Sequence, residues 1–258
     1  MNSEPILSVR KLEKRYGSFI GCADVSFDVW PGEVVAIVGE SGSGKTTLLN
    51  CISTRLERSS GEMRYRMRDG RFPDLAELSE AELRFLMRTD WGFVHQNPAD
   101  GLRMRVSAGA NVGERLMAIG DRNYGEIRRR ASDWLERVEI ASTRIDDTPV
   151  SFSGGMRQRL QIARNLVTHP RLIFMDEPTG GLDVSVQARV LDLLRMLVSD
   201  LNLSVIIVTH DLAVARLLSQ RMIVMKSGRI VEQGLTDRVM DDPSHPYTQL
   251  LVASILEN

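Results

Sequence analysis

The sequence predicts an α/β fold: a mixed sheet flanked by helices, with an antiparallel β region at the N-terminus and a helical insertion. Three observations predict it. A glycine-rich loop at 39–46 follows an apolar strand and precedes a helix, which is the order of a strand–loop–helix unit. The continuous apolar runs at 172–175 and 205–208 are typical of parallel strands covered on both faces. The apolar–polar alternation within residues 7–29 is instead typical of antiparallel strands with one solvated face.

The loop reads GESGSGKT and fits the phosphate-binding pattern GxxxxGK[ST] at every position. Its glycines let successive backbone N–H groups turn toward one anion, and the helix N-terminus adds partial positive charge. We expect Lys45 to reach the β- and γ-phosphates of a nucleoside triphosphate and the Thr46 hydroxyl to ligate Mg²⁺. The predicted nucleotide-binding residues of this P-loop are Gly39, Ser41, Gly42, Gly44, Lys45, Thr46 and Thr47.

Composition restricts the classes of partner. The 258 residues suffice for a full core, and the formal net charge of −1 gives no overall basic field for nucleic acid. No apolar run approaches the roughly 20 residues that cross a bilayer, and the N-terminus lacks a signal peptide's apolar segment. Two cysteines are too few for a disulfide framework or a metal cluster. We therefore expect a cytoplasmic protein that binds no nucleic acid and does not insert into a membrane.

An apolar strand at 172–175 ends in two carboxylates, Asp176 and Glu177. Asp176, at the carboxyl end of the strand, is placed to contact Mg²⁺, usually through water. Glu177 is expected to polarise a water that attacks the γ-phosphate. Adjacent acids are common at strand ends, so this catalytic interpretation depends on the phosphate loop being present as well.

A second anion site is predicted where Ser153, Gly154 and Gly155 begin a helix that runs to about Val167. Ser153 suits an N-cap, and the paired glycines expose free N–H groups at the helix start. A merely well-capped helix is the alternative. The position just upstream of the acidic strand favours the functional interpretation.

Three single residues complete the candidate site. Gln96 follows the strand 91–95 and is expected to contact Mg²⁺ or the attacking water, and His210 follows the strand 205–208 and is expected to hydrogen-bond the γ-phosphate. Asp183 lies on the turn before the helix expected at 185–201. Each of these residue types is usually structural when it occurs alone, so the predicted roles depend on their order along the chain.

The helical insertion is expected at about 77–165, within a single nucleotide-binding domain that spans all 258 residues. Ser79 and Glu82 form a capping box at its first helix. The pattern predicts two or three further helical segments between residues 105 and 140, punctuated by Gly120 and Gly125.

Taken in their order along the chain, the candidate site residues described above resemble those of the nucleotide-binding domain of the ATP-binding cassette (ABC) superfamily. The resemblance covers essentially the whole chain. The resemblance implies an ATPase that uses ATP and Mg²⁺, with Glu177 as catalytic base, assisted by Gln96 and His210. It also implies that Tyr16 stacks on adenine. The matched motifs are the Walker A loop at 39–46, the Q-loop at Gln96, the signature at Ser153–Met156, the Walker B strand ending at Asp176, the D-loop at Asp183 and the switch at His210.

The family resemblance further implies a head-to-tail dimer, expected to be a homodimer, with each ATP held between Walker A of one subunit and the signature of the other. Two departures from the family pattern stand out. The signature reads FSGGM where LSGGQ is commoner, and Gly180-Gly181 replaces bulkier residues in the D-loop.

Within the superfamily, the segment 97–117 is similar to cassette ATPases of the bacterial carbon–phosphorus lyase system. That similarity implies a soluble carbon–phosphorus lyase core complex as partner, which ATP turnover, stimulated by the partner, would open or remodel during phosphonate catabolism. Residues 152–159 and 245–251 look instead like dipeptide and oligopeptide importer ATPases, so an import motor for peptides, nickel or phosphonate is the alternative. A third hypothesis, a nucleotide-gated assembly factor with negligible turnover, is opposed by the presence of Glu177 and His210.

Overall fold

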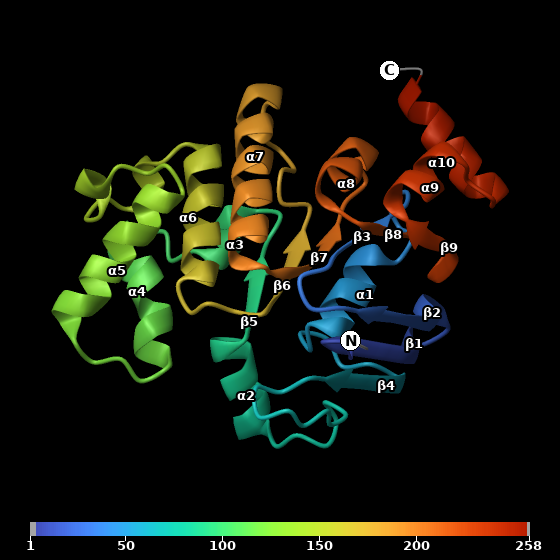
Figure 1. Ribbon diagram of the computed structural model, residues 1–258, viewed down its shortest axis with the longest axis horizontal. Helices are drawn as coiled ribbons and strands as arrows, with labels where there is room; N and C mark the ends of the chain where they lie inside the picture. Colours follow the sequence, from blue (N-terminus) through green and yellow to red (C-terminus); the bar gives the residue numbers. More distant parts are fainter. Residues whose placement is uncertain (1–3, 257–258) are drawn as a thin grey trace. The chain divides into compact units, whose positions relative to one another are not determined.

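The computed structural model describes residues 4–256 and divides the chain into two compact units. The first unit contains the chain up to Glu80 together with the chain from Asn202 onward. The second unit is Ala81–Leu201. Figure 1 labels the helices and strands of both units. Within residues 4–256, every helix is too short or too polar to cross a bilayer.

The first unit begins with an antiparallel sheet in the order β2-β1-β4 (Figure 1). Its strands are β1 (Leu7–Tyr16), β2 (Phe19–Val29) and β4 (Ser60–Tyr65). Leu7, Val9 and Leu12 are fully buried, whereas Arg10 and Lys11 between them are exposed. The antiparallel region predicted from the alternation is therefore confirmed.

A mixed sheet forms the rest of the first unit. Strand β3 (Val34–Val38) lies between β7 (Ser204–Val208) and β8 (Arg221–Lys226) and is parallel to both, and β9 (Arg229–Leu235) is antiparallel to β8. All residues of β3 and β7 are buried, as their apolar composition predicts. The helices of this unit are α1 (Lys45–Ile52), α8 (Leu212–Leu218), α9 (Thr236–Asp241) and α10 (Pro246–Leu256).

In the second unit, β5 (Trp91–Val94) and β6 (Leu172–Asp176) form a parallel pair with Trp91 opposite Leu172. Parallel strands end at the same edge of a sheet, so Gln96 and Asp176 leave this pair on the same side. The helices of this unit are α2 (Glu80–Thr89), α3 (Pro98–Gly101), α4 (Ala108–Ala118), α5 (Tyr124–Arg137), α6 (Gly154–Leu166) and α7 (Val184–Leu201), with short 3₁₀ turns at Ser142–Arg144 and Pro149–Ser151.

The helix boundary expected at Gly125 differs from the prediction. Gly120, with φ +105°, lies between α4 and α5 as expected, but Gly125 does not interrupt a helix. It is the second residue of α5, whose N-cap Asn123 accepts a hydrogen bond from the Glu126 N–H at 3.1 Å. A side-chain cap fixes the helix start, so the glycine is tolerated in the first turn.

Candidate active site

The phosphate loop takes a backbone path that only glycine can follow at two of its positions. Gly39 has φ +148° and Gly44 has φ +99°. A Cβ added to Gly39 would lie 2.3 Å from the Met225 carbonyl oxygen, and one added to Gly44 would lie 2.3 Å from the Gly21 carbonyl oxygen. The loop is thus held against β8 on one side and β2 on the other, with no room for a side chain at either contact.

Lys45 begins α1 and reaches back across the loop. Its Nζ donates to the carbonyl oxygens of Gly39 at 2.7 Å and of Glu40 at 2.8 Å, and the residue is only 7% exposed. Buried lysines are rare unless their charge is satisfied, and here backbone carbonyls supply acceptors. The ammonium group is therefore held inside the loop, where the sequence predicts a phosphate.

Two further features fit an anion in this loop. Gly44 occupies the N-cap of α1 and has no side chain, so the first turn carries no side-chain cap. The buried Ser43 hydroxyl has no hydrogen-bond partner among residues 4–256, and a buried orphan donor calls for a missing acceptor. Phosphate oxygens would supply it. Ser43 was not among the residues predicted for this loop.

Tyr16 lies beside this loop, at the end of β1, with 48% of its surface exposed. A Cβ added to Gly21 would lie 2.9 Å from the Tyr16 ring and 2.8 Å from the Thr47 side chain, so Gly21 separates the two. The Lys14 ammonium lies 5.3 Å from the ring centroid. The structure thus brings the predicted adenine-stacking ring to the start of α1. Gly21 carries no motif, and sequence reasoning missed it.

His210 and Gly228 follow β7 and β8, the two strands that lie parallel to β3, so both residues lie at the edge of the mixed sheet where the phosphate loop begins. The Thr209 N–H donates to the Ile37 carbonyl at 3.1 Å, so the exposed His210 leaves the sheet beside the strand that leads into the phosphate loop. The Gly228 N–H, in the β8–β9 turn, donates to the Ser43 carbonyl at 2.9 Å. Gly228 therefore supports the loop from a point far along the chain, a role that its sequence position did not reveal.

In the second unit, Asp176 is the last residue of β6, and Glu177 follows with φ +44°. Such a left-handed conformation is uncommon outside glycine and is concentrated at functional sites. The Gly180 N–H donates to the Glu177 carbonyl at 2.9 Å and closes the turn.

Gln96 lies against this same turn. A Cβ added to Gly180 would lie 3.3 Å from the Gln96 side-chain nitrogen. A larger residue at this position would therefore crowd Gln96, which gives a local reason for one D-loop departure from the family pattern. Within the second unit, the structure places the Gln96 side chain beside the turn that begins at Glu177.

The signature helix α6 begins as predicted, with the Ser153 hydroxyl accepting from the Met156 N–H at 3.3 Å. Gly154 is exposed, whereas Gly155 is buried against α7, where an added Cβ would lie 2.2 Å from a Val186 methyl. Asp183 caps α7 by accepting from the Ser185 hydroxyl at 2.8 Å and the Val186 N–H at 3.0 Å. These bonds, led by that from Ser185, hold the pKa of Asp183 below its usual value. Its role toward nucleotide stays a prediction.

The unusual signature residues share one neighbour, Arg144. Its guanidinium lies 4.5 Å from the Phe152 ring centroid, and its Nη1 lies 3.5 Å from the Met156 sulfur. The same guanidinium pairs with Asp147 at 2.7 Å. The face of an aromatic ring attracts a cation, and a thioether sulfur is a weak hydrogen-bond acceptor, so the FSGGM sequence has a local packing reason.

The predicted site residues fall into two groups. The first unit contains Tyr16, Gly39, Ser41, Gly42, Gly44, Lys45, Thr46, Thr47 and His210, and the second contains Gln96, Ser153, Gly154, Gly155, Asp176, Glu177 and Asp183. Within each group, the contacts above place the phosphate loop near Tyr16 and Gln96 near Glu177.

The family model and the relatives that match this chain all describe ATP-binding proteins or ABC transporters. The family model "ABC transporter" matches residues 22–180. The chain is 66% identical over 256 residues to the "Putative phosphonates utilization ATP-binding protein PhnK" of Escherichia coli (strain K12), covering 99% of this chain and 100% of that protein. It is 38% identical to a "Putative peptide import ATP-binding protein" of Brucella melitensis biotype 1, covering 99% of this chain and 79% of the relative.

Two solved structures are similar over most of the chain at 30% sequence identity. One is the ATP-binding cassette MJ0796, a dimer in a post-hydrolysis state bound to ADP and Pi, with a TM-score of 0.78 over 89% of this chain and 98% of that one. The other is cbiO1 from Clostridium perfringens, part of the transporter complex cbiONQ, with a TM-score of 0.80 over 93% of this chain and 92% of that one. The predicted α/β cassette fold is confirmed.

Proposed function

This chain belongs to the ABC transporter family and is an ATP-binding ATPase, and we propose that it serves phosphonate catabolism by docking as a dimer on a soluble carbon–phosphorus lyase core. ATP turnover would open or remodel that core in the cytoplasm. The observation that carries the proposal is the 66% identity to a phosphonates utilization protein over that protein's full length.

The proposed hydrolysis step is an in-line attack of water on the γ-phosphorus. The new P–O bond forms as the bond to the β–γ bridging oxygen breaks, which yields ADP and phosphate. Glu177 orients the water and accepts its proton. Lys45 and the loop N–H groups stabilise the charge on the transferring group, and His210 hydrogen-bonds the γ-phosphate.

Mg²⁺ is the proposed cofactor, held by Thr46, Asp176 and Gln96 together with phosphate oxygens. Hydroxyl, carboxylate and amide oxygens are ligands that Mg²⁺ accepts, and such sites usually retain waters. Bound Mg²⁺ would neutralise charge on the β- and γ-phosphates.

Dimerisation would complete each ATP site. We propose a head-to-tail homodimer in which the α6 start of one subunit, with the Ser153 hydroxyl and the N–H groups of Gly154 and Gly155, faces the γ-phosphate held by its partner's loop. Ser153 and Gly154 are exposed, and Val184 beside Asp183 is 84% exposed, so this surface is available to a second subunit. The dimeric state of the MJ0796 cassette supports the proposal.

An import motor is the second candidate function, since peptide import ATP-binding proteins are 38–39% identical over 99% of the chain. In that case the residues after Gln96 would contact a membrane permease for peptides, nickel or phosphonate. The identity is much lower than the 66% of the phosphonates utilization protein, and this chain covers only 79–80% of those relatives.

The deciding experiment is affinity purification of tagged Glu177→Gln from its native cells with ATP and Mg²⁺, with membrane and membrane-free fractions analysed separately. Lys45→Ala is the matched control, because it should not load ATP. We expect ATP-dependent recovery of phosphonate-degrading core subunits from the membrane-free fraction with Glu177→Gln alone. Recovery of an integral membrane permease instead would contradict the proposal and establish the import motor.

A further inference from the structure

Two side-chain amides of the signature helix α6, those of Gln161 and Asn165, form hydrogen bonds with the β5 backbone of the kind that a neighbouring strand would form. One edge of β5 pairs with β6, and the backbone at its other edge bonds to α6. The Phe93 N–H donates to Asn165 Oδ1 at 3.0 Å, and Asn165 Nδ2 donates to the Phe93 carbonyl at 2.9 Å. The His95 N–H donates to Gln161 Oε1 at 2.6 Å, and Gln161 Nε2 donates to the His95 carbonyl at 3.1 Å.

The match is geometric. A side-chain amide has the same donor and acceptor as a peptide group. Gln161 and Asn165 are four residues apart on a helix, a rise of about 6.0 Å. Phe93 and His95 are two residues apart in extended chain, a rise of about 6.6 Å. Both amides are buried, Gln161 at 0% and Asn165 at 6% exposure, so water offers no replacement for these bonds.

The two amides differ in how close their backbone partners lie to Gln96. Gln161 holds His95, whose next residue is Gln96, whereas Asn165 holds Phe93, three residues before Gln96. Gln161 also supports the chain after Gln96, because a Cβ added to Gly101 would lie 2.2 Å from Gln161 Oε1. Gln161 therefore contacts the chain both before Gln96, at His95, and after it, at Gly101.

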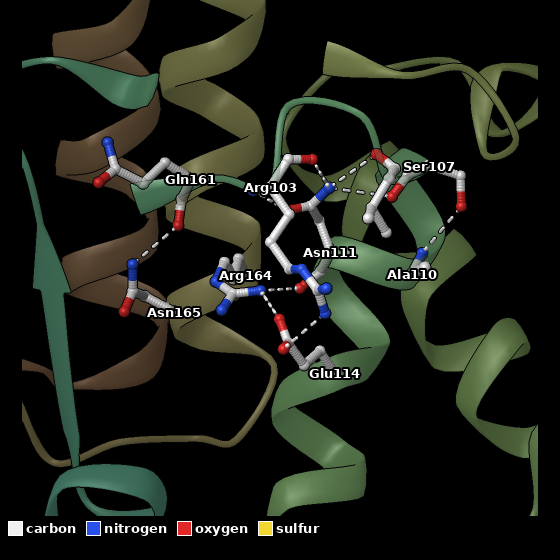
Figure 2. Close-up of polar contacts among 9 residues, drawn as sticks. Arg103, Ser107, Ala110, Asn111, Glu114, Gln161, Arg164 and Asn165 are labelled. Carbon is white, nitrogen blue, oxygen red and sulfur yellow. Dashed lines mark hydrogen bonds and ion pairs between the residues drawn. The ribbon is translucent and has the colours of Figure 1, made fainter. Parts of the chain in front are cut away.

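The same helix holds the chain further on, as Figure 2 shows. Arg164 donates to the Asn111 carbonyl at 2.6 Å and pairs with Glu114 at 2.8 Å. The buried Asn111 accepts from the Arg103 N–H at 2.8 Å and donates to the carbonyls of Arg103, Val106 and Ser107. The segment from 95 to 114 is thus bonded to α6 at both ends.

We infer that Gln161 is a positioning residue for ATP hydrolysis: it fixes Gln96 relative to the helix that begins with Ser153–Gly155. This inference rests on the role proposed above for Gln96. Gln161 touches no reacting atom; it acts through the His95 backbone and the Gly101 contact. A movement of the chain around Gln96, from His95 to Gly101, is thereby transmitted to the signature residues Ser153–Gly155. A movement of the signature residues is transmitted to Gln96 in the same way.

The test compares Gln161→Met with Asn165→Leu. Each variant keeps the approximate size of a buried side chain and removes a pair of hydrogen bonds to the same strand edge, so a purely structural role predicts equal effects on turnover. We expect kcat to fall at least about tenfold with Gln161→Met, with little change in ATP affinity, and to stay within about twofold of wild type with Asn165→Leu. Equal losses of kcat in the two variants, or no loss in Gln161→Met, would overturn the inference.

Two further variants keep the result interpretable. Gly101→Ala should lower kcat as Gln161→Met does, because the new Cβ displaces the Gln161 amide. If Gln161→Met does not fold, Gly101→Ala tests the inference in its place. A native kcat in Gly101→Ala would overturn the inference. In a Gln96→Ala background, Gln161→Met should cause no additional loss, because residues that act as a unit are not additive. Native turnover by the single variant Gln96→Ala would instead show that Gln96 does not have the role proposed above. The inference about Gln161 would then be wrong as well, because it depends on that role.

Discussion

The contact between the signature helix and α7 gives a prediction of definite size. In Gly155→Ala the new Cβ would lie 2.2 Å from a Val186 methyl, whereas carbon atoms in contact lie about 3.5–4.0 Å apart, so the two must separate by about 1.5 Å. Overpacking of this kind costs about 1–3 kcal/mol. The gain in helix propensity on replacing glycine offsets about 0.5–1 kcal/mol. We therefore expect a net loss of about 1–2 kcal/mol in the free energy of unfolding.

Gly154→Ala is the matched control, one residue earlier in the same helix. Its new Cβ would lie 3.4 Å from the Leu182 side chain, an ordinary contact, so this variant should be unchanged or slightly stabilised. Since 1 kcal/mol shifts the melting temperature of a chain of this size by about 2–4 °C, the two variants should differ by about 2–8 °C in differential scanning calorimetry. Val186→Ala should rescue Gly155→Ala. Equal melting temperatures for the two alanine variants would refute the packing argument.

Three further outcomes are expected at the candidate site. Lys45→Ala removes the ammonium that bonds the Gly39 and Glu40 carbonyls, so ATP affinity in titration calorimetry should fall at least about tenfold, and unchanged affinity would contradict its phosphate role. Glu177→Gln keeps the side chain's size but not its basicity; turnover should fall by about 10²-fold or more while an ATP-bound dimer accumulates in size-exclusion chromatography, and native turnover would require another base. Hydrogen bonds keep the folded-state pKa of Asp183 below 3.8, so its stabilising effect is present above about pH 4 and lost as pH falls through the lowered pKa. The difference in melting temperature between wild type and Asp183→Ala should narrow from about pH 6 to pH 3, and a constant or widening difference would count against the cap.

Local patterns predicted most of the elements. The apolar run of β3 and the glycine spacing of the loop are properties of adjacent residues, so the strand, the loop and the start of α1 could be placed from the sequence. The boundary error at Gly125 arose because an Asn123 cap outweighed the glycine's weak helix propensity.

Long-range contacts could not be predicted in the same way. Gln161 pairs with His95 across 66 residues, and no periodicity distinguishes it from any other buried helix residue. Gly180 stood out in the sequence only as a departure from a family pattern, and its reason is the neighbouring Gln96 side chain. Such pairs become visible only when the chain is folded, because neither partner carries a local signal.

The support that the phosphate loop receives from the far end of the chain has a consequence for biosynthesis. The loop at 39–46 is made early, yet it is hydrogen-bonded by Gly228 and abuts the Met225 carbonyl, while its strand pairs with β7 and β8. A nascent chain on the ribosome therefore contains the whole nucleotide motif long before the segments that shape it have emerged. Because non-local contacts form only after their loops close, nucleotide capture becomes possible near the end of translation.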